Sequence, residues 1–182
     1  DDWVRIFYDK SFKSWDFLKY YSTLFDVVEI NSTFYTFIAQ NYFSKASKIT
    51  PQDFKFNVKL HQNITHKFTE QKETMDKFSY SIKPLIEGNK LGYILAQFPY
   101  SFKANENNIK YLLNINEYHL PIVYEFRNFY WSKNEILQNL KENNIPIVSV
   151  DTPGLKGLFP SKIIINSDIL YFRLHGRNAE NW

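Results

Sequence analysis

The sequence contains no cysteine, only five glycines and a single methionine among its 182 residues. Without cysteine the chain can form neither disulfide bonds nor thiolate metal sites, and a cytoplasmic location is the default expectation. No apolar run approaches the roughly 20 residues that a membrane-spanning helix needs, so no membrane partner is expected.

What the sequence has in abundance is apolar and aromatic side chains, at 44% and 19% of all residues. This composition excludes a disordered chain and predicts a large core that is rich in rings. The formal net charge of +3 is too small to indicate nucleic-acid binding by itself, because proteins that bind polyanions carry a clear basic stripe. The length fits one domain.

Short strand-like segments alternate with segments of helical spacing along the chain. Residues 152–168 are the exception, since they show no helical pattern between the last two strands. The alternation predicts βαβ units, and therefore an α/β fold with a parallel sheet. The predicted strands are Phe25–Asn31, Phe54–His61, Leu91–Phe98, Pro121–Arg127, Ile145–Asp151 and Ile169–His175.

Each predicted strand has one apolar face, which helices would cover, and in five of the six the second face becomes polar only at its carboxyl end. The second strand is the exception, because Lys55 and Asn57 make that face polar throughout. Leu170, Phe172 and Leu174 belong to the apolar face of the last strand, for example. In parallel β/α folds the carboxyl ends of the strands form the active site. An antiparallel sheet with one solvated face is the alternative, although it would scatter polar residues along each strand.

Six motifs in order resemble the YecE-like family, also called domain of unknown function 72. They are VEINSTFY from Val28, FKFNVKLHQNITH from Phe54, AQFPYSF from Ala96, YEFRNFYW from Tyr124, VDTPG from Val150 and YFRLHGRN from Tyr171. The resemblance covers essentially residues 1–182 as a single domain and implies a TIM-barrel-like (β/α) architecture. It also implies that the chain holds strands two to seven of eight, with the first and last strands lacking. It names no activity.

Acidic residues and a histidine at the strand ends are the candidate catalytic groups: Glu29, Glu125, Asp151 and His175. Paired carboxylates divide into general acid and general base when their surroundings separate their pKa values. The alternative is a structural network in which each carboxylate neutralises a nearby cation.

Cations at the same strand ends predict a site for a small anion, because the planar fork of arginine suits carboxylate and phosphate. The candidate substrate-binding residues are Asn31, Tyr35, Lys59, His61, Gln97, Arg127, Trp131, Arg173 and Arg177. Histidines and carboxylates together also allow a metal site, but no His-Glu-x-x-His motif is present. We therefore predict no metal and no cofactor.

The function predicted from these residues is acid–base chemistry on a small phosphorylated or carboxylated substrate at the mouth of a barrel. The alternative is a nucleic-acid or nucleotide binding protein that uses the same basic and aromatic mouth. We favour the enzyme because charges of both signs gather at the strand ends. The oligomeric state is not predicted.

Overall fold

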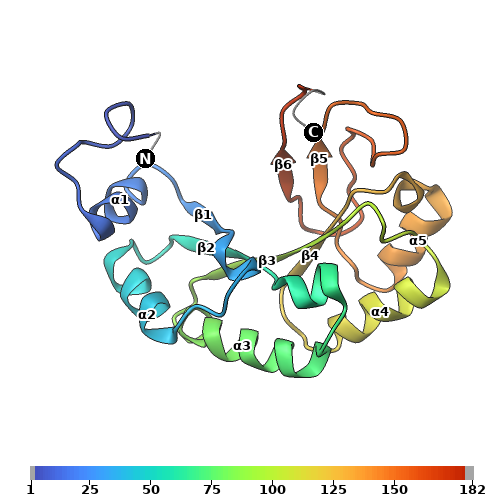
Figure 1. Cartoon of the computed structure of the whole chain (residues 1–182), viewed down its shortest axis with the longest axis horizontal. Helices are drawn as coiled ribbons and strands as arrows, with labels where there is room; N and C mark the ends of the chain where they lie inside the picture. Colours follow the sequence, from blue (N-terminus) through green and yellow to red (C-terminus); the bar gives the residue numbers. More distant parts are fainter. Residues whose placement is uncertain (1–2, 179–182) are drawn as a thin grey trace. The chain divides into compact units, whose positions relative to one another are not determined.

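The computed structural model describes residues 3–178, in which strands alternate with helices in an α/β fold (Figure 1). One sheet has the strand order β1-β2-β3-β4, and a second sheet pairs β5 with β6. The strands are β1 Val27–Ile30, β2 Lys55–Lys59, β3 Leu91–Phe98, β4 Ile122–Phe126, β5 Ser149–Asp151 and β6 Phe172–Leu174. The α-helices are α1 Ser14–Tyr21, α2 Gln40–Ile49, α3 Gln71–Glu87, α4 Glu106–Asn116 and α5 Asn134–Glu142.

The alternation predicted from the sequence is confirmed, since each predicted strand contains one observed strand. Three short turns of other helix types were not predicted: η1 Ser32–Phe34, η2 Asn63–Lys67 and η3 Phe129–Ser132. Residues 152–168, all of which the structure describes, contain no helix, as the sequence indicated. No described helix is both long enough and apolar enough to cross a membrane.

The chain forms two compact units. Unit 1 contains the residues up to 64 and residues 69–92, and unit 2 contains residues 65–68 and the residues from 93 onward. In unit 1, β1 and β2 are parallel, with Val27 opposite Lys55 and Ile30 opposite Val58. The backbone N–H of Phe56 donates to the carbonyl oxygen of Lys90 at 2.8 Å, which places the start of β3 beside β2.

The core of unit 1 is formed by α2, α3 and β2. Helix α3 buries residues three and four positions apart, which is the spacing of one helix face. The buried side chains of this core are Phe43, Ala46, Phe56, Val58, Met75, Phe78, Ile82 and Leu85. Of the residues with helical spacing in α2, Phe43 and Ala46 are buried, whereas Tyr42 is 39% exposed.

One charged side chain is buried in unit 1. Lys90, which directly precedes β3, is 2% exposed, and its ammonium donates to the carbonyl oxygens of Thr50 and Pro51 just after α2. Burial lowers the pKa of Lys90, and the nearby charge of Lys55 lowers it further. The carbonyl groups after a helix have no partner within it, so Lys90 supplies one and fixes α2 against the sheet.

In unit 2 every strand pair is parallel. Strands β3 and β4 pair with Gln97 opposite Glu125, and β5 and β6 pair with Val150 opposite Arg173. A single parallel bridge joins Tyr124 to Ile147, just before β5. A mixed α/β fold with parallel strands in sequential order is therefore established, as predicted.

A stack of aromatic rings closes the core of unit 2. Trp131 in η3 is fully buried and lies parallel to Phe126 at 4.1 Å between ring centroids, and to Phe102 at 5.5 Å. Its indole Nε1 donates to the carbonyl oxygen of Phe102 at 2.6 Å. Trp131 has no exposed surface, and the rings of Phe102 and Phe126 pack against it. No face of its ring is therefore open to a ligand. The predicted substrate-binding role of Trp131 therefore does not fit its position.

The last strand differs from the prediction on one face. Leu170, Phe172 and Leu174, which we expected to be covered by helices, are 55%, 45% and 74% exposed. The corresponding residues of β4, Tyr124 and Phe126, are buried. No helix follows β6 among the residues that the structure describes, so this face has no covering layer there.

We predict that Trp131→Ala lowers the free energy of unfolding by about 3–5 kcal/mol, because it removes a large buried ring from the stack. Urea denaturation measures this change. Tyr130→Ala is the matched control, since the neighbouring ring is 52% exposed, and it should change stability little. A Trp131→Ala protein of unchanged stability would contradict the core position.

Candidate functional site

The buried carboxylate of Glu125 organises the candidate site. Glu125 lies on β4, is 1% exposed, and accepts a hydrogen bond from Arg173 Nη1 at its Oε2, at 2.7 Å. Its Oε1 lies 3.2 Å from Nε2 of His175. Arg173 and His175 are two residues apart on and just after β6 and therefore point to the same side. One carboxylate thus contacts both the arginine and the histidine.

The charges of this cluster follow from its geometry. Burial raises the pKa of Glu125, but the hydrogen bond from His175 and the charge of Arg173 outweigh this, so the net pKa lies below its ordinary value. Glu125 is therefore a carboxylate at neutral pH. A carboxylate can only accept, so Nε2 of His175 donates its proton to Oε1, and the basic nitrogen of the neutral ring is Nδ1.

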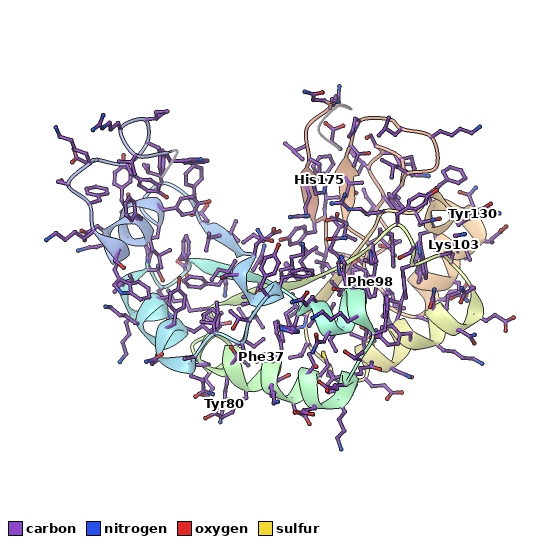
Figure 2. All side chains as sticks on the ribbon, in the orientation of Figure 1. Phe37, Tyr80, Phe98, Lys103, Tyr130 and His175 are labelled. Carbon is purple, nitrogen blue, oxygen red and sulfur yellow. The ribbon has the colours of Figure 1, made fainter. Side chains whose placement is uncertain are left out.

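The three side chains differ in their access to solvent. The side chain of Glu125 is 2% exposed, whereas those of Arg173 and His175 are 19% and 17% exposed. A ligand can therefore reach the arginine and the histidine while the carboxylate behind them stays dry. His175, labelled in Figure 2, lies at the end of β6. Arg173 and His175 therefore lie together beside Glu125.

A second ion pair lies beside the first. Nε of Arg177 donates to both carboxylate oxygens of Asp151, at 3.2 and 3.1 Å. The backbone N–H of His175 donates to the carbonyl oxygen of Asp151 at 2.9 Å, which places β6 next to the end of β5. Five predicted site residues of unit 2 are thus linked by these contacts: Glu125, Asp151, Arg173, His175 and Arg177.

Two other predicted residues of unit 2 have mainly structural contacts. The Gln97 side chain is buried and its Nε2 donates to the carbonyl oxygen of Phe98 at 2.9 Å. Arg127 directly follows β4, and its carbonyl oxygen accepts from the backbone N–H of Phe159 at 2.8 Å. Both residues therefore stand at carboxyl strand ends, as predicted, and hold backbone segments there.

The remaining predicted residues belong to unit 1. His61 stacks on Phe37 with 4.4 Å between ring centroids, and the ammonium of Lys59 lies 4.5 Å from the ring centroid of Phe34. The others are Glu29 on β1, Asn31 directly after it and Tyr35, which is 70% exposed. The predicted convergence of Glu29 with Glu125 joins residues of different units and stays a prediction.

The residues of the strand ends that the sequence did not identify are residues with hydroxyl side chains. Thr33 is 1% exposed, and its Oγ1 donates to the carbonyl oxygens of Ile30 and Lys59 at 3.0 and 2.6 Å, which fastens the end of β1 to the end of β2. In unit 2, Thr152 and Ser161 are hydrogen-bonded to each other. The sequence could have indicated Thr33, because it lies in the segment Asn31-Ser32-Thr33 directly after a strand, where hydroxyl side chains often bind the backbone.

No group of three or more His, Asp or Glu side chains among residues 3–178 is arranged to hold a metal ion. Nδ1 of His66 lies 2.9 Å from the hydroxyl of the neighbouring Thr65.

Comparison with known proteins identifies the family. The family model described as "Protein of unknown function DUF72" matches residues 1–182. This chain belongs to the DUF72 family. The resemblance drawn from the six sequence motifs is thereby confirmed.

Relatives of known sequence and structure agree with this assignment. The chain is 30% identical over 179 residues to UPF0759 protein YunF of Bacillus subtilis (strain 168), covering 91% of this chain and 64% of that protein's length. A DUF72 family protein from Thermotoga maritima MSB8 is 39% identical with a TM-score of 0.86, over 98% of this chain and 72% of the other. One from Enterococcus faecalis V583 is 30% identical with a TM-score of 0.84, over 93% and 73% of the two chains.

The low pKa of Glu125 predicts a pH-dependent contribution to stability. A carboxyl whose folded-state pKa is depressed stabilises the fold above its unfolded pKa and loses this effect as the pH falls through the folded value. We expect Glu125→Gln to lower the free energy of unfolding by roughly 2 kcal/mol at neutral pH. The difference from the unmodified protein should shrink below pH 4.5, the ordinary pKa of the group.

Urea denaturation of both proteins over a series of pH values measures this difference. Glu73→Gln is the matched control, because Glu73 also pairs with a cation, Lys77, but on the exposed surface of α3. Its effect should be much smaller at every pH. A Glu125→Gln difference that is equally large at pH 3 would show that the carboxylate charge is not the cause.

Proposed function

We propose that this DUF72 protein is an enzyme that carries out acid–base chemistry on a small anionic substrate at the carboxyl ends of β4, β5 and β6. The observation that supports this proposal is the buried carboxylate of Glu125, which holds the partly exposed Arg173 and His175 side by side. A cationic group for binding and a titratable group for proton transfer are thus presented together.

His175 is the proposed proton-transfer group. Its imidazole donates from Nε2 to Glu125, which fixes the tautomer and leaves Nδ1 as the basic atom. Histidine is suited to this role because its ordinary pKa lies near neutral pH. Glu125 positions the ring through this hydrogen bond, and its lowered pKa keeps it ionised at neutral pH.

Arg173 is the proposed binding group for the anion. Its Nη1 is anchored on Glu125, and a guanidinium presents several N–H groups in a fixed plane, so an anchored arginine can still donate to a ligand oxygen. Asp151 and Glu29 are the proposed further acid–base groups, because both stand at strand ends. Asn31, Tyr35, Lys59 and His61 remain the proposed substrate contacts from unit 1.

Two finer features complete the proposal. The parallel strands in sequential order support a TIM-barrel-like architecture, in which active sites lie at the carboxyl ends of the strands. The absence of cysteine supports a location in the reducing cytoplasm. Fold alone assigns no reaction, so the proposed chemistry rests on the Glu125 cluster.

A panel of small carboxylates and sugar phosphates tests the function through the melting temperature of the protein. We expect at least one of them to raise the melting temperature by mass action. Arg173→Lys should weaken this binding about tenfold, because lysine keeps the charge but loses the planar fork. Lys77→Ala, which removes an exposed cation of α3, is the matched control and should bind normally.

His175→Asn separates binding from chemistry. We expect this variant to bind the stabilising anion and to lose its turnover. Stabilisation by a single-stranded oligonucleotide with a steep salt dependence, and by none of the small anions, would instead favour nucleic-acid binding.

A further inference from the structure

An open depression lies at the carboxyl end of β5. Its volume is about 440 Å³, and it is lined by residues 151–155 together with Ser161 and Arg177. Asp151 and Arg177 were predicted as site residues, but the loop between β5 and Ser161 has no role in the proposed proton transfer.

Arg177 is oriented at this depression while most of it stays accessible. Its side chain is 80% exposed and its Nε is held by both oxygens of Asp151. In the described part of the chain, its terminal Nη groups donate to no protein acceptor. The ion pair therefore fixes one edge of the guanidinium and leaves the end with two amino groups for a ligand.

The loop opposite Arg177 is held by hydroxyl groups. The backbone N–H of Thr152 donates to Oγ of Ser161 at 2.8 Å, and the Ser161 hydroxyl donates back to the carbonyl oxygen of Thr152 at 2.8 Å. Oγ1 of Thr152 lies 3.3 Å from the same hydroxyl. These contacts fix both ends of the loop, so the residues between them are positioned before any ligand binds.

The middle of this loop offers backbone donors. Among the residues that the structure describes, the N–H groups of Gly154 and Leu155 donate to no protein acceptor. Gly154 is exposed, and a Cβ built on it meets no atom within 4 Å. Successive backbone N–H groups next to a cation are a common anion-binding arrangement.

We propose that the depression binds the phosphoryl group of the substrate, with Arg177 and the Gly154–Leu155 amides as donors. This inference rests on the proposed function and names its substrate class as a phosphorylated small molecule. The terminal fork of Arg177 matches two oxygens of a phosphoryl group, and the loop amides serve the third. A carboxylate has two oxygens and would leave the amides without a ligand.

The proposed phosphoryl subsite lies next to His175, the proposed proton-transfer group. His175 donates its backbone N–H to the carbonyl oxygen of Asp151, and Asp151 lines the depression. The depression therefore begins next to the proposed proton-transfer group. A phosphorylated substrate bound by Arg177 would therefore place its other atoms toward Arg173 and His175.

Binding of inorganic phosphate, measured by isothermal titration calorimetry with acetate as the comparison anion, tests the subsite. The decisive pair of variants is Gly154→Asp and Gly154→Asn. Both side chains enter open space, but only aspartate adds a negative charge. We expect Gly154→Asp to weaken phosphate binding more than tenfold and Gly154→Asn to preserve it within about twofold.

Arg177→Gln should also weaken phosphate binding about tenfold, and Arg177→Lys should restore only part of it. Lys162→Ala is the control, since Lys162 is an exposed cation of the same loop outside the depression. Equal phosphate affinity in the unmodified protein, Gly154→Asp and Arg177→Gln would overturn the proposal. So would an acetate affinity as high as that for phosphate, or no measurable phosphate binding at all.

One further variant separates this inference from the proposed function. His175→Asn should bind inorganic phosphate normally, because His175 is the proposed proton-transfer group and does not line the depression. Phosphate binding that depends on Arg173 and not on Arg177 would overturn the subsite while the function stands. Phosphate binding that depends on Arg177, in a protein that turns over no phosphorylated compound, would support the subsite and count against the enzyme.

Discussion

The ionised, buried carboxylate of Glu125 is the interaction on which the site depends. A carboxylate in a dry interior is costly unless cations and hydrogen bonds compensate it. Arg173 and His175 supply both, one on each oxygen, and they come from the strand that is farthest along the chain. The same contact that makes the charge tolerable therefore brings the end of β6 to the end of β4.

Polar side chains take the place of a helix between β5 and β6. The hydroxyl of Ser149 accepts from the backbone N–H of Ile164 at 2.9 Å, and the amide of Asn166 binds the backbone of Ile145 and Ile147 at 2.8 and 2.9 Å. These bonds satisfy backbone groups that would otherwise be buried without partners. These bonds hold the connection between β5 and β6, which contains no helix, against the backbone before and within β5.

The relatives share the fold and supply no reaction. Agreement with the Thermotoga maritima protein at a TM-score of 0.86 over 98% of this chain shows that the strand and helix arrangement is a property of the family. Function lives in the groups placed on such a fold. In the proposed site those groups are Arg173 and Arg177, each paired with a carboxylate, together with His175.

The sequence alone predicted where the strands and helices lie, because apolar alternation and helical spacing are local properties of the chain. It also placed Glu125, Arg173 and His175 at carboxyl strand ends. What it could not decide was which polar residues meet. The pairing of Glu125 with β6 joins residues that are 48 and 50 positions apart, and no local pattern encodes such a contact.

Burial was the second property that only the tertiary structure decided. Trp131 follows a strand end exactly as a ligand-stacking residue would, yet Phe102 and Phe126 enclose it, whereas Leu174 has the pattern of a core residue and is exposed. A side chain is buried only when another element packs over it. Whether such an element packs there depends on the tertiary structure, and the periodicity of the sequence does not show it.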